Sequence, residues 1–201
     1  AGVPKQIKFK TKPQIALEQI RWACESGLPR GVALMDAAYG RDARLRAGMT
    51  ELDVPYAVGI VPTILMWAPG SGPRRMDKPM NNTGRRDEPE LVSAKKVALG
   101  LPKQAWRTMT WREGSADQLS SRFARVRVHV AHRHLTADRH AEEWLLIEWP
   151  SDEPEPTKYW LSTLAKGITF ERLVDLAKLR WRIERDYQEL KQELGLGHFE
   201  G

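Results

Sequence analysis

The sequence predicts an α/β fold that a β-rich insertion interrupts and a long C-terminal helix closes, and three observations lead to it. Residues 12–60 alternate two patterns of helical period with two short apolar runs. Residues 122–162 instead contain runs in which polar and apolar residues alternate, as they do in antiparallel strands. Residues 169–194 form one charged amphipathic pattern of helical period, which ends before Gly195.

The first segment, residues 1–66, has the pattern of part of a parallel sheet. Two short apolar runs are each preceded by a pattern of helical period, and strands separated by helices usually pair in parallel. The run "GVALMD" predicts a buried central strand with Asp36 at its carboxyl end. In chain order we expect a strand at 6–11, a helix at 12–27 with Pro13 near its start, a strand at 31–36, a helix at 41–52 and a strand at 55–61.

The second segment, residues 67–166, predicts an exposed loop followed by antiparallel strands. Its first part, residues 67–90, is rich in glycine, proline, asparagine and charge. The alternating runs "FARVRVHVAHRH" and "EEWLLIEWP" and the following "KYWLSTL" predict strands with hairpin-like spacing. We expect the tryptophans of this insertion mostly to fill a small β core. The third segment, residues 167–201, is expected to return to the core as one helix that begins at Thr169.

Charge and composition favour a nucleic-acid partner. The 201 residues carry a net charge of +6 and an isoelectric point near 9.5, and arginine suits bidentate contacts with phosphate. The single cysteine, Cys24, cannot form an internal disulfide, so we expect a reducing compartment. No signal peptide is recognisable, and Pro62 breaks the longest apolar run. We therefore expect a cytoplasmic protein without a membrane span.

Asp36 is the first residue whose position suggests chemistry. It follows a buried apolar run, at the edge of the sheet where α/β proteins place their sites. One interpretation is that its carboxylate caps the next turn, because a carboxylate buried without a partner is costly. The other is that it binds a metal ion.

The final helix aligns Arg180, Glu184 and Lys191 on one stripe, because their separations are close to whole numbers of turns. One interpretation is an ordinary helix stabilised by the Arg180–Glu184 pair at i,i+4. The other is that Glu184 holds a hard cation while the two basic residues hold phosphates. Spacing alone leaves both open.

Together these residues resemble a known family. The pattern R-x3-E-x6-K in "RWRIERDYQELKQELGLGHFEG", with "DAAYG" upstream, is similar to the DDE transposases of bacterial insertion sequences, in the branch with a Tyr-Arg-Glu-Lys signature helix. The resemblance implies a ribonuclease H-like core, with Asp36 and Glu184 as the second and third acidic ligands of Mg²⁺ or Mn²⁺. It implies that Arg180 and Lys191 contact DNA phosphates. It also implies that the protein is associated with the nucleoid and that the whole protein acts as a homodimer.

Two departures from the family pattern stand out. The signature tyrosine falls at Ala177, and Tyr187, one turn after Glu184, could substitute for it as a DNA contact. No aspartate precedes Asp36, whereas the family has its first catalytic aspartate on an earlier strand. We therefore expect a fragment whose core is incomplete at its N-terminus and which is inactive as an isolated chain.

The activity implied for the intact protein is two-metal cleavage of DNA at transposon ends, followed by strand transfer to target DNA. Two alternatives remain open from the residues. The chain could be a non-catalytic DNA-binding remnant of a transposase, or a metal-dependent nuclease without strand transfer.

The run "HVAHRHLTADRH" offers a possible zinc site. It contains four histidines, but no cysteine is near, and alternation places His129 on the opposite strand face from His132 and His134. The alternative is a solvated strand edge whose arginines contact DNA. The histidines concerned are His129, His132, His134 and His140, and the arginines are Arg125, Arg127 and Arg133.

Overall fold

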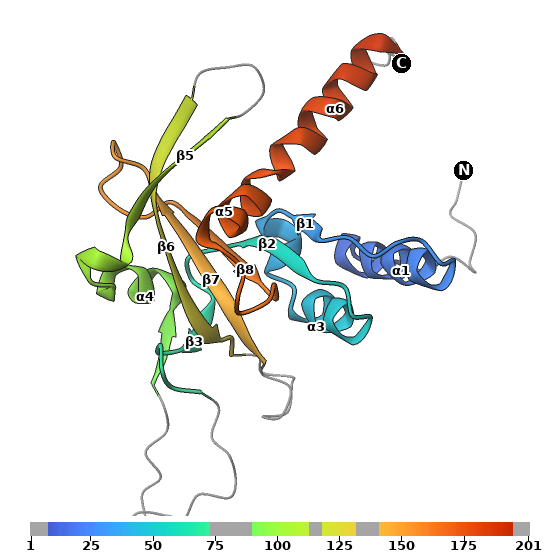
Figure 1. Ribbon diagram of the computed structural model, residues 1–201. Coiled ribbons are helices and arrows are strands. Elements are labelled where there is room, and N and C mark those ends of the chain that lie inside the picture. Colours follow the sequence, from blue (N-terminus) through green and yellow to red (C-terminus); the bar gives the residue numbers. More distant parts are fainter. Residues whose placement is uncertain (1–7, 73–89, 113–117, 132–140, 195–201) are drawn as a thin grey trace, which may run out of the picture.

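The computed structural model describes residues 8–72, 90–112, 118–131 and 141–194. Six of its strands form one sheet (Figure 1), in the order β1 (Ala33–Met35), β2 (Tyr56–Ile60), β8 (Lys158–Ser162), β7 (Glu142–Trp149), β6 (Gln118–His129) and β5 (Arg107–Arg112). β1 and β2 are parallel, and every later neighbour in this order is antiparallel. The predicted parallel pair and the predicted antiparallel stretch are both confirmed.

The strands of the predicted insertion continue the sheet of the first segment. β8 pairs with β2 from Ala57 opposite Ser162 to Ile60 opposite Tyr159. A separate two-stranded sheet, β3 (Leu65–Trp67) and β4 (Leu91–Ser93), flanks the predicted loop, of which residues 73–89 lie outside the described part. The fold is therefore a mixed α/β structure organised around one sheet, consistent with the ribonuclease H-like core.

β1 differs from its prediction as a buried central strand. Its three residues are only half-buried, and within the described residues no strand pairs with its other edge. A strand paired on one side presents a row of unpaired backbone groups on the other. The apolar composition of "ALM" is that of a central strand, but its place here is at the edge.

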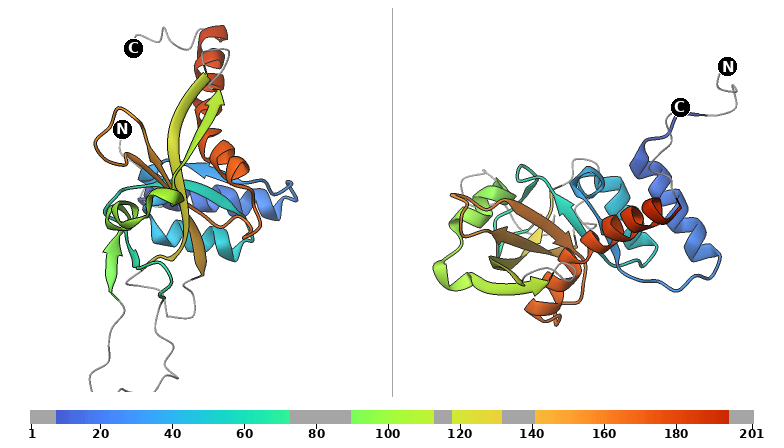
Figure 2. Two further views of the ribbon diagram at one scale, coloured as in Figure 1. Left: turned by 60° about the vertical axis from the view of Figure 1, so that its left-hand side comes forward. Right: turned by 90° about the horizontal axis from the view of Figure 1, so that it is seen from above.

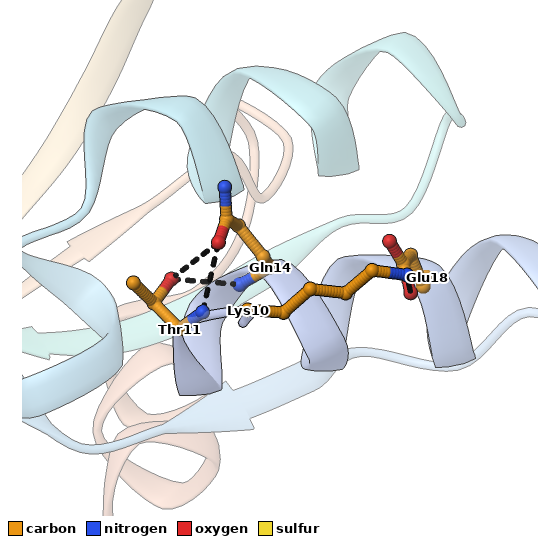
Figure 3. Close-up of polar contacts among 4 residues, drawn as sticks. All are labelled: Lys10, Thr11, Gln14 and Glu18. Carbon is orange, nitrogen blue, oxygen red and sulfur yellow. Dashed lines mark hydrogen bonds and ion pairs between the residues drawn. The ribbon is translucent and has the colours of Figure 1, made fainter. Parts of the chain in front are cut away.

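The first helix, α1 (Lys12–Glu25), begins at a capping box (Figure 3). The Thr11 side chain accepts from the Gln14 backbone N–H, and the Gln14 side chain accepts from the Thr11 N–H at 2.8 Å. Lys10 pairs with Glu18 at 2.7 Å along the same helix. The strand predicted for residues 6–11 is wrong for its described part, because residues 8–10 form no regular element and Thr11 is committed to the cap.

Two apolar cores lie on the two faces of the sheet. One contains Val58 and Leu145 and is covered by three helices from the first half of the chain. The short helix η1 (Lys103–Ala105) follows the last of these helices in the sequence. The other contains Phe123, Trp144 and Leu146 and is covered by α5 (Phe170–Lys178), as the views of Figure 2 show. Trp144 therefore fills the β core as expected. The helices of the first face are α1, α3 (Ala43–Glu51) and α4 (Ala94–Gly100), while α2 (Ala37–Gly40) follows β1.

The predicted single final helix is two helices. α5 ends at Lys178, and the N–H of the next residue, Leu179, donates to the carbonyl oxygen of Leu176, three residues back, as in a tightened turn. α6 (Arg180–Glu193) then projects away from the sheet (Figure 1). Its apolar stripe is exposed rather than packed on the core, and consists of Ile183, Tyr187, Leu190 and Leu194. In the described part of the chain, no helix combines the length and the apolar composition that a membrane span requires.

Candidate active site

Asp36 lies directly after β1 and caps α2. One carboxylate oxygen, Oδ1, accepts from the backbone N–H groups of Ala38 at 2.9 Å and Tyr39 at 3.2 Å. The side chain remains 41% exposed, and its second oxygen, Oδ2, faces Arg180. The capping interpretation of Asp36 is therefore present in the structure, and it uses only one of the two oxygens.

Close backbone approach holds the turn after Asp36 against the sheet. A Cβ atom added at Gly40 would lie 1.9 Å from the carbonyl oxygen of Gly59 on β2, so only glycine fits there. The carbonyl oxygen of Gly40 also accepts from the guanidinium of Arg46, which is 2% exposed. The N–H of Gly40 donates to the carbonyl oxygen of Asp36, so these contacts also hold the backbone of Asp36 in place.

Arg180 joins the two carboxylates that the sequence singles out. Its Nη1 lies 3.9 Å from Oδ2 of Asp36, and its Nη2 donates to Oε1 of Glu184. The first residue of α6 thereby reaches the end of β1, and both carboxylates lie beside one guanidinium. The i,i+4 pair of Arg180 and Glu184 is therefore present, as is the Asp36 cap described above. In addition, the approach of Arg180 to Asp36 brings the two carboxylates to the same guanidinium group.

The donor set suits a hard divalent cation. Oδ2 of Asp36 and the 62% exposed side chain of Glu184 offer carboxylate oxygens, which Mg²⁺ prefers and usually uses together with substrate phosphates. The Arg180 guanidinium, 36% exposed, already provides one positive charge beside both. Within the described residues no group of three or more histidine, cysteine, aspartate or glutamate side chains could hold a metal, so the set present is two carboxylates.

The other predicted DNA contacts lie farther along α6. Lys191 places its Nζ 4.6 Å from the centroid of the Tyr187 ring, and Tyr187 is 59% exposed. Ala177, at the family's tyrosine position, is 5% exposed on the core-facing side of α5, where a tyrosine ring would not fit without repacking.

Sequence patterns did not reveal a buried polar network beneath the turn. The hydroxyl of Tyr56 on β2 donates to Glu143 on β7 at 2.9 Å. Burial raises the pKa of the Glu143 carboxyl group, and the charge of Arg46 and the bond from Tyr56 oppose the rise. Burial and the negative charge of Glu143 raise the pKa of the Tyr56 hydroxyl. The available signal was the position of Glu143 on the apolar face of the alternating run "EEWLLIEW".

A second buried pair also escaped prediction. Nζ of Lys178, at the end of α5, donates to both oxygens of Glu148 on β7, at 2.8 and 2.6 Å. The two side chains are 7% and 3% exposed. This pair joins the end of α5 to β7, two residues before Arg180.

The histidine cluster is only partly described. His129 lies at the end of β6, whereas His132, His134 and His140 fall outside the described residues. Arg127, on the same strand, pairs with Glu142 at 3.1 Å.

A comparison with known proteins identifies the family of the chain. Residues 1–145, more than two thirds of the chain, match the family model described as DDE superfamily endonuclease. The matched stretch contains Asp36 and ends before α5 and α6. A search of curated proteins finds no significant match. The chain, with Asp36 held at the end of β1 inside the matched region, therefore belongs to the DDE superfamily endonucleases.

Proposed function

We propose that this chain contributes the second and third acidic ligands of a two-metal DNA-cleaving site in a transposase. The observation that carries the proposal is the guanidinium of Arg180, which lies 3.9 Å from Asp36 and is hydrogen-bonded to Glu184. Arg180 places a positive charge beside both carboxylates, and a divalent metal ion bound between them would do the same. The family membership makes DNA the substrate, and strand transfer after cleavage is part of the proposal.

Asp36 and Glu184 would hold Mg²⁺ or Mn²⁺. When bound, such a cation supplies positive charge to phosphate oxygens and lowers the pKa of a bound water. Arg180 would exchange its carboxylate contacts for a phosphate of the DNA, for which its planar fork of donors is suited. Lys191 and Tyr187, exposed farther along α6, would contact the DNA backbone beyond the cleavage position.

A third carboxylate would complete the set. We infer that it is carried by a strand that pairs with the open edge of β1, because that edge lies beside Asp36 and no strand among the described residues pairs with it. On this proposal the 201-residue chain binds metal weakly and does not cleave DNA efficiently by itself. The full protein would act as a homodimer on paired DNA ends.

Metal binding tests the proposal without relying on activity. Titration of the chain with Mn²⁺, followed by electron paramagnetic resonance, should show a site whose affinity falls at least about tenfold in Asp36→Asn and in Glu184→Gln. Glu189→Gln is the matched control, because Glu189 is exposed on the same helix and pairs only with Arg185 among the described contacts. If both site variants bind Mn²⁺ like the unaltered chain, the proposal is wrong and Asp36 and Glu184 are structural.

A second assay separates the alternatives. A chain extended to include a strand that pairs with β1 should nick DNA and join the freed 3′ ends to target DNA. Nicking without joining would identify a nuclease without strand transfer. DNA binding with neither reaction would identify a non-catalytic remnant.

A further inference from the structure

We propose that Arg107 and Arg125 form a second phosphate-binding site, on the sheet beside the start of α5, which holds the backbone of double-stranded DNA. The proposal deepens the proposed function, on which it rests for the choice of DNA as the polyanion. It concerns residues of β5, β6 and α5, whereas the metal-binding proposal concerns the end of β1 and α6.

The two arginines converge on one aromatic ring. Arg107 is opposite Phe123 in the register of β5 and β6, so Arg107 and Arg125 project from the same face of the sheet. Their guanidinium carbons lie 5.6 and 5.1 Å from the centroid of the Phe170 ring, the first residue of α5. Phe170 is 5% exposed, so the ring is a fixed support on which both cations rest.

The two charges repel each other and have little compensation. Burial lowers the pKa of the Arg125 guanidinium, and the charge of Arg107 lowers it further, while Glu171 opposes the shift. Among the residues that the structure describes, neither arginine forms an ion pair. Arg127, two residues along β6, differs because Glu142 neutralises it at 3.1 Å. An anion that bridges Arg107 and Arg125 would remove this repulsion.

Hydrogen-bond donors remain available for that anion. Arg125 uses one terminal nitrogen to donate to the carbonyl oxygen of Ile168 at 2.7 Å, which orients its guanidinium next to the start of α5. Arg107 is exposed on β5. Two oriented guanidinium groups suit bidentate contacts with phosphate oxygens, and they carry no information about base sequence.

The location favours duplex DNA over an isolated phosphate. Figure 1 shows α5 between β5 on one side and β1 on the other, and α5 leads directly into α6. α5 ends at Lys178, two residues before Arg180, so a duplex that is held at Asp36 and Glu184 and runs along α5 would meet the arginine pair at the start of that helix. Binding there would position the DNA rather than take part in cleavage.

Arg122 offers a matched control. It lies on the same strand, β6, and also stacks on an aromatic ring, with its guanidinium 4.5 Å from the centroid of Trp149. Because side chains alternate along a strand, Arg122 projects from the face opposite to Arg125. Arg122→Gln removes the same charge from the protein without touching the proposed site.

The experiment measures binding of a fluorescein-labelled duplex of arbitrary sequence by anisotropy, in EDTA, across about 50 to 200 mM salt. Arg107→Gln should weaken binding and make the slope of log affinity against log salt shallower by about 0.9. The affinity lost between about 50 and 200 mM salt should then be about 3.5-fold smaller than in the unaltered chain. Arg107→Gln with Arg125→Gln should lower the slope by about 1.8, and Arg107→Lys should retain it. Arg122→Gln should change the slope less than Arg107→Gln does.

Several outcomes would overturn the proposal. An unchanged slope in Arg107→Gln would do so, since this exposed residue can be replaced without loss of the fold. Equal losses in Arg107→Gln and Arg122→Gln would show that net charge alone controls binding. A slope that no variant changes would show that duplex DNA does not bind at this surface. Because EDTA removes metal, failure here is distinguishable from failure of Mn²⁺ binding at Asp36 and Glu184.

Discussion

Replacing Lys178 by methionine should destabilise the protein strongly, although the change makes a buried side chain more apolar. The Lys178 side chain is 7% exposed and donates to both oxygens of Glu148, whose side chain is 3% exposed. Methionine has a similar length and would still contact the Phe123 and Trp160 rings, over which Nζ lies at 5.6 Å. What it cannot do is compensate the charge of Glu148.

The magnitude follows from the balance of two terms. At a separation of 2.6 Å, the attraction between the two charges is about 6 kcal/mol at an effective dielectric constant of about 20. Desolvation of the two ions costs several kcal/mol each, so the intact pair contributes little net stability. Lys178→Met removes the attraction and leaves the desolvated carboxylate, which should lower the free energy of unfolding by about 3–5 kcal/mol.

Urea denaturation followed by tryptophan fluorescence measures this loss. Lys178→Met combined with Glu148→Leu should recover most of it, because neither charge then remains buried. Lys166→Met is the surface control: Lys166 pairs with Glu142 at 3.1 Å but is 77% exposed, and its loss should cost at most about 1 kcal/mol. If the free energy of unfolding of Lys178→Met lies within about 1 kcal/mol of that of the unaltered chain, the unpaired Glu148 carboxylate is not costly and this prediction is wrong.

Three further predictions concern Gly40, in the turn after Asp36, and the two glutamates at the start of β7, Glu142 and Glu143. Gly40→Ala should lower the free energy of unfolding by about 1–3 kcal/mol in urea denaturation, because its Cβ would meet the backbone of Gly59 at 1.9 Å; Gly167→Ala, where nothing lies within 4 Å, should not. Since burial raises the pKa of Glu143, its contribution to stability is present below its unfolded pKa and is lost as pH rises through its folded pKa. Thermal melts should therefore show Glu143→Gln gaining stability relative to the unaltered chain as pH rises, and a constant difference would contradict this. Glu142 should behave oppositely, because hydrogen bonding to Lys166 lowers its pKa: the advantage of the unaltered chain over Glu142→Gln should shrink as pH falls through the folded pKa, and a difference that grows would be the contrary result.

Local periodicity was sufficient for much of the fold. The alternation of helical patterns and apolar runs in residues 12–60 predicted two parallel strands, and β1 and β2 pair in parallel. The alternating runs that became β6 and β7 predicted antiparallel pairing. Both follow from residue spacing of about 3.6 in helices and 2 in strands, which is a property of short segments.

Local patterns failed where the outcome depended on distant partners. The composition of β1 indicates a strand covered on both sides, but its edge position depends on which strands lie beside it. The helix predicted from Thr169 carries an uninterrupted pattern, yet it divides at Leu179, just after Lys178 is anchored to Glu148 on another element. The apolar stripe of α6 likewise predicted core packing, and a stripe does not specify its partner.

Residue types and their spacing along the chain specify the side chains that are available for chemistry: Asp36 after an apolar strand, and Arg180 and Glu184 one turn apart on a helix. That these side chains meet is a property of the folded chain, in which Arg180 approaches Asp36 to 3.9 Å. The same is true of Arg107 and Arg125, which share the Phe170 ring. Spacing along the chain sets the direction of a side chain on its own element. Contacts between elements depend instead on sheet register, helix breaks and close backbone approach, which many residues fix together.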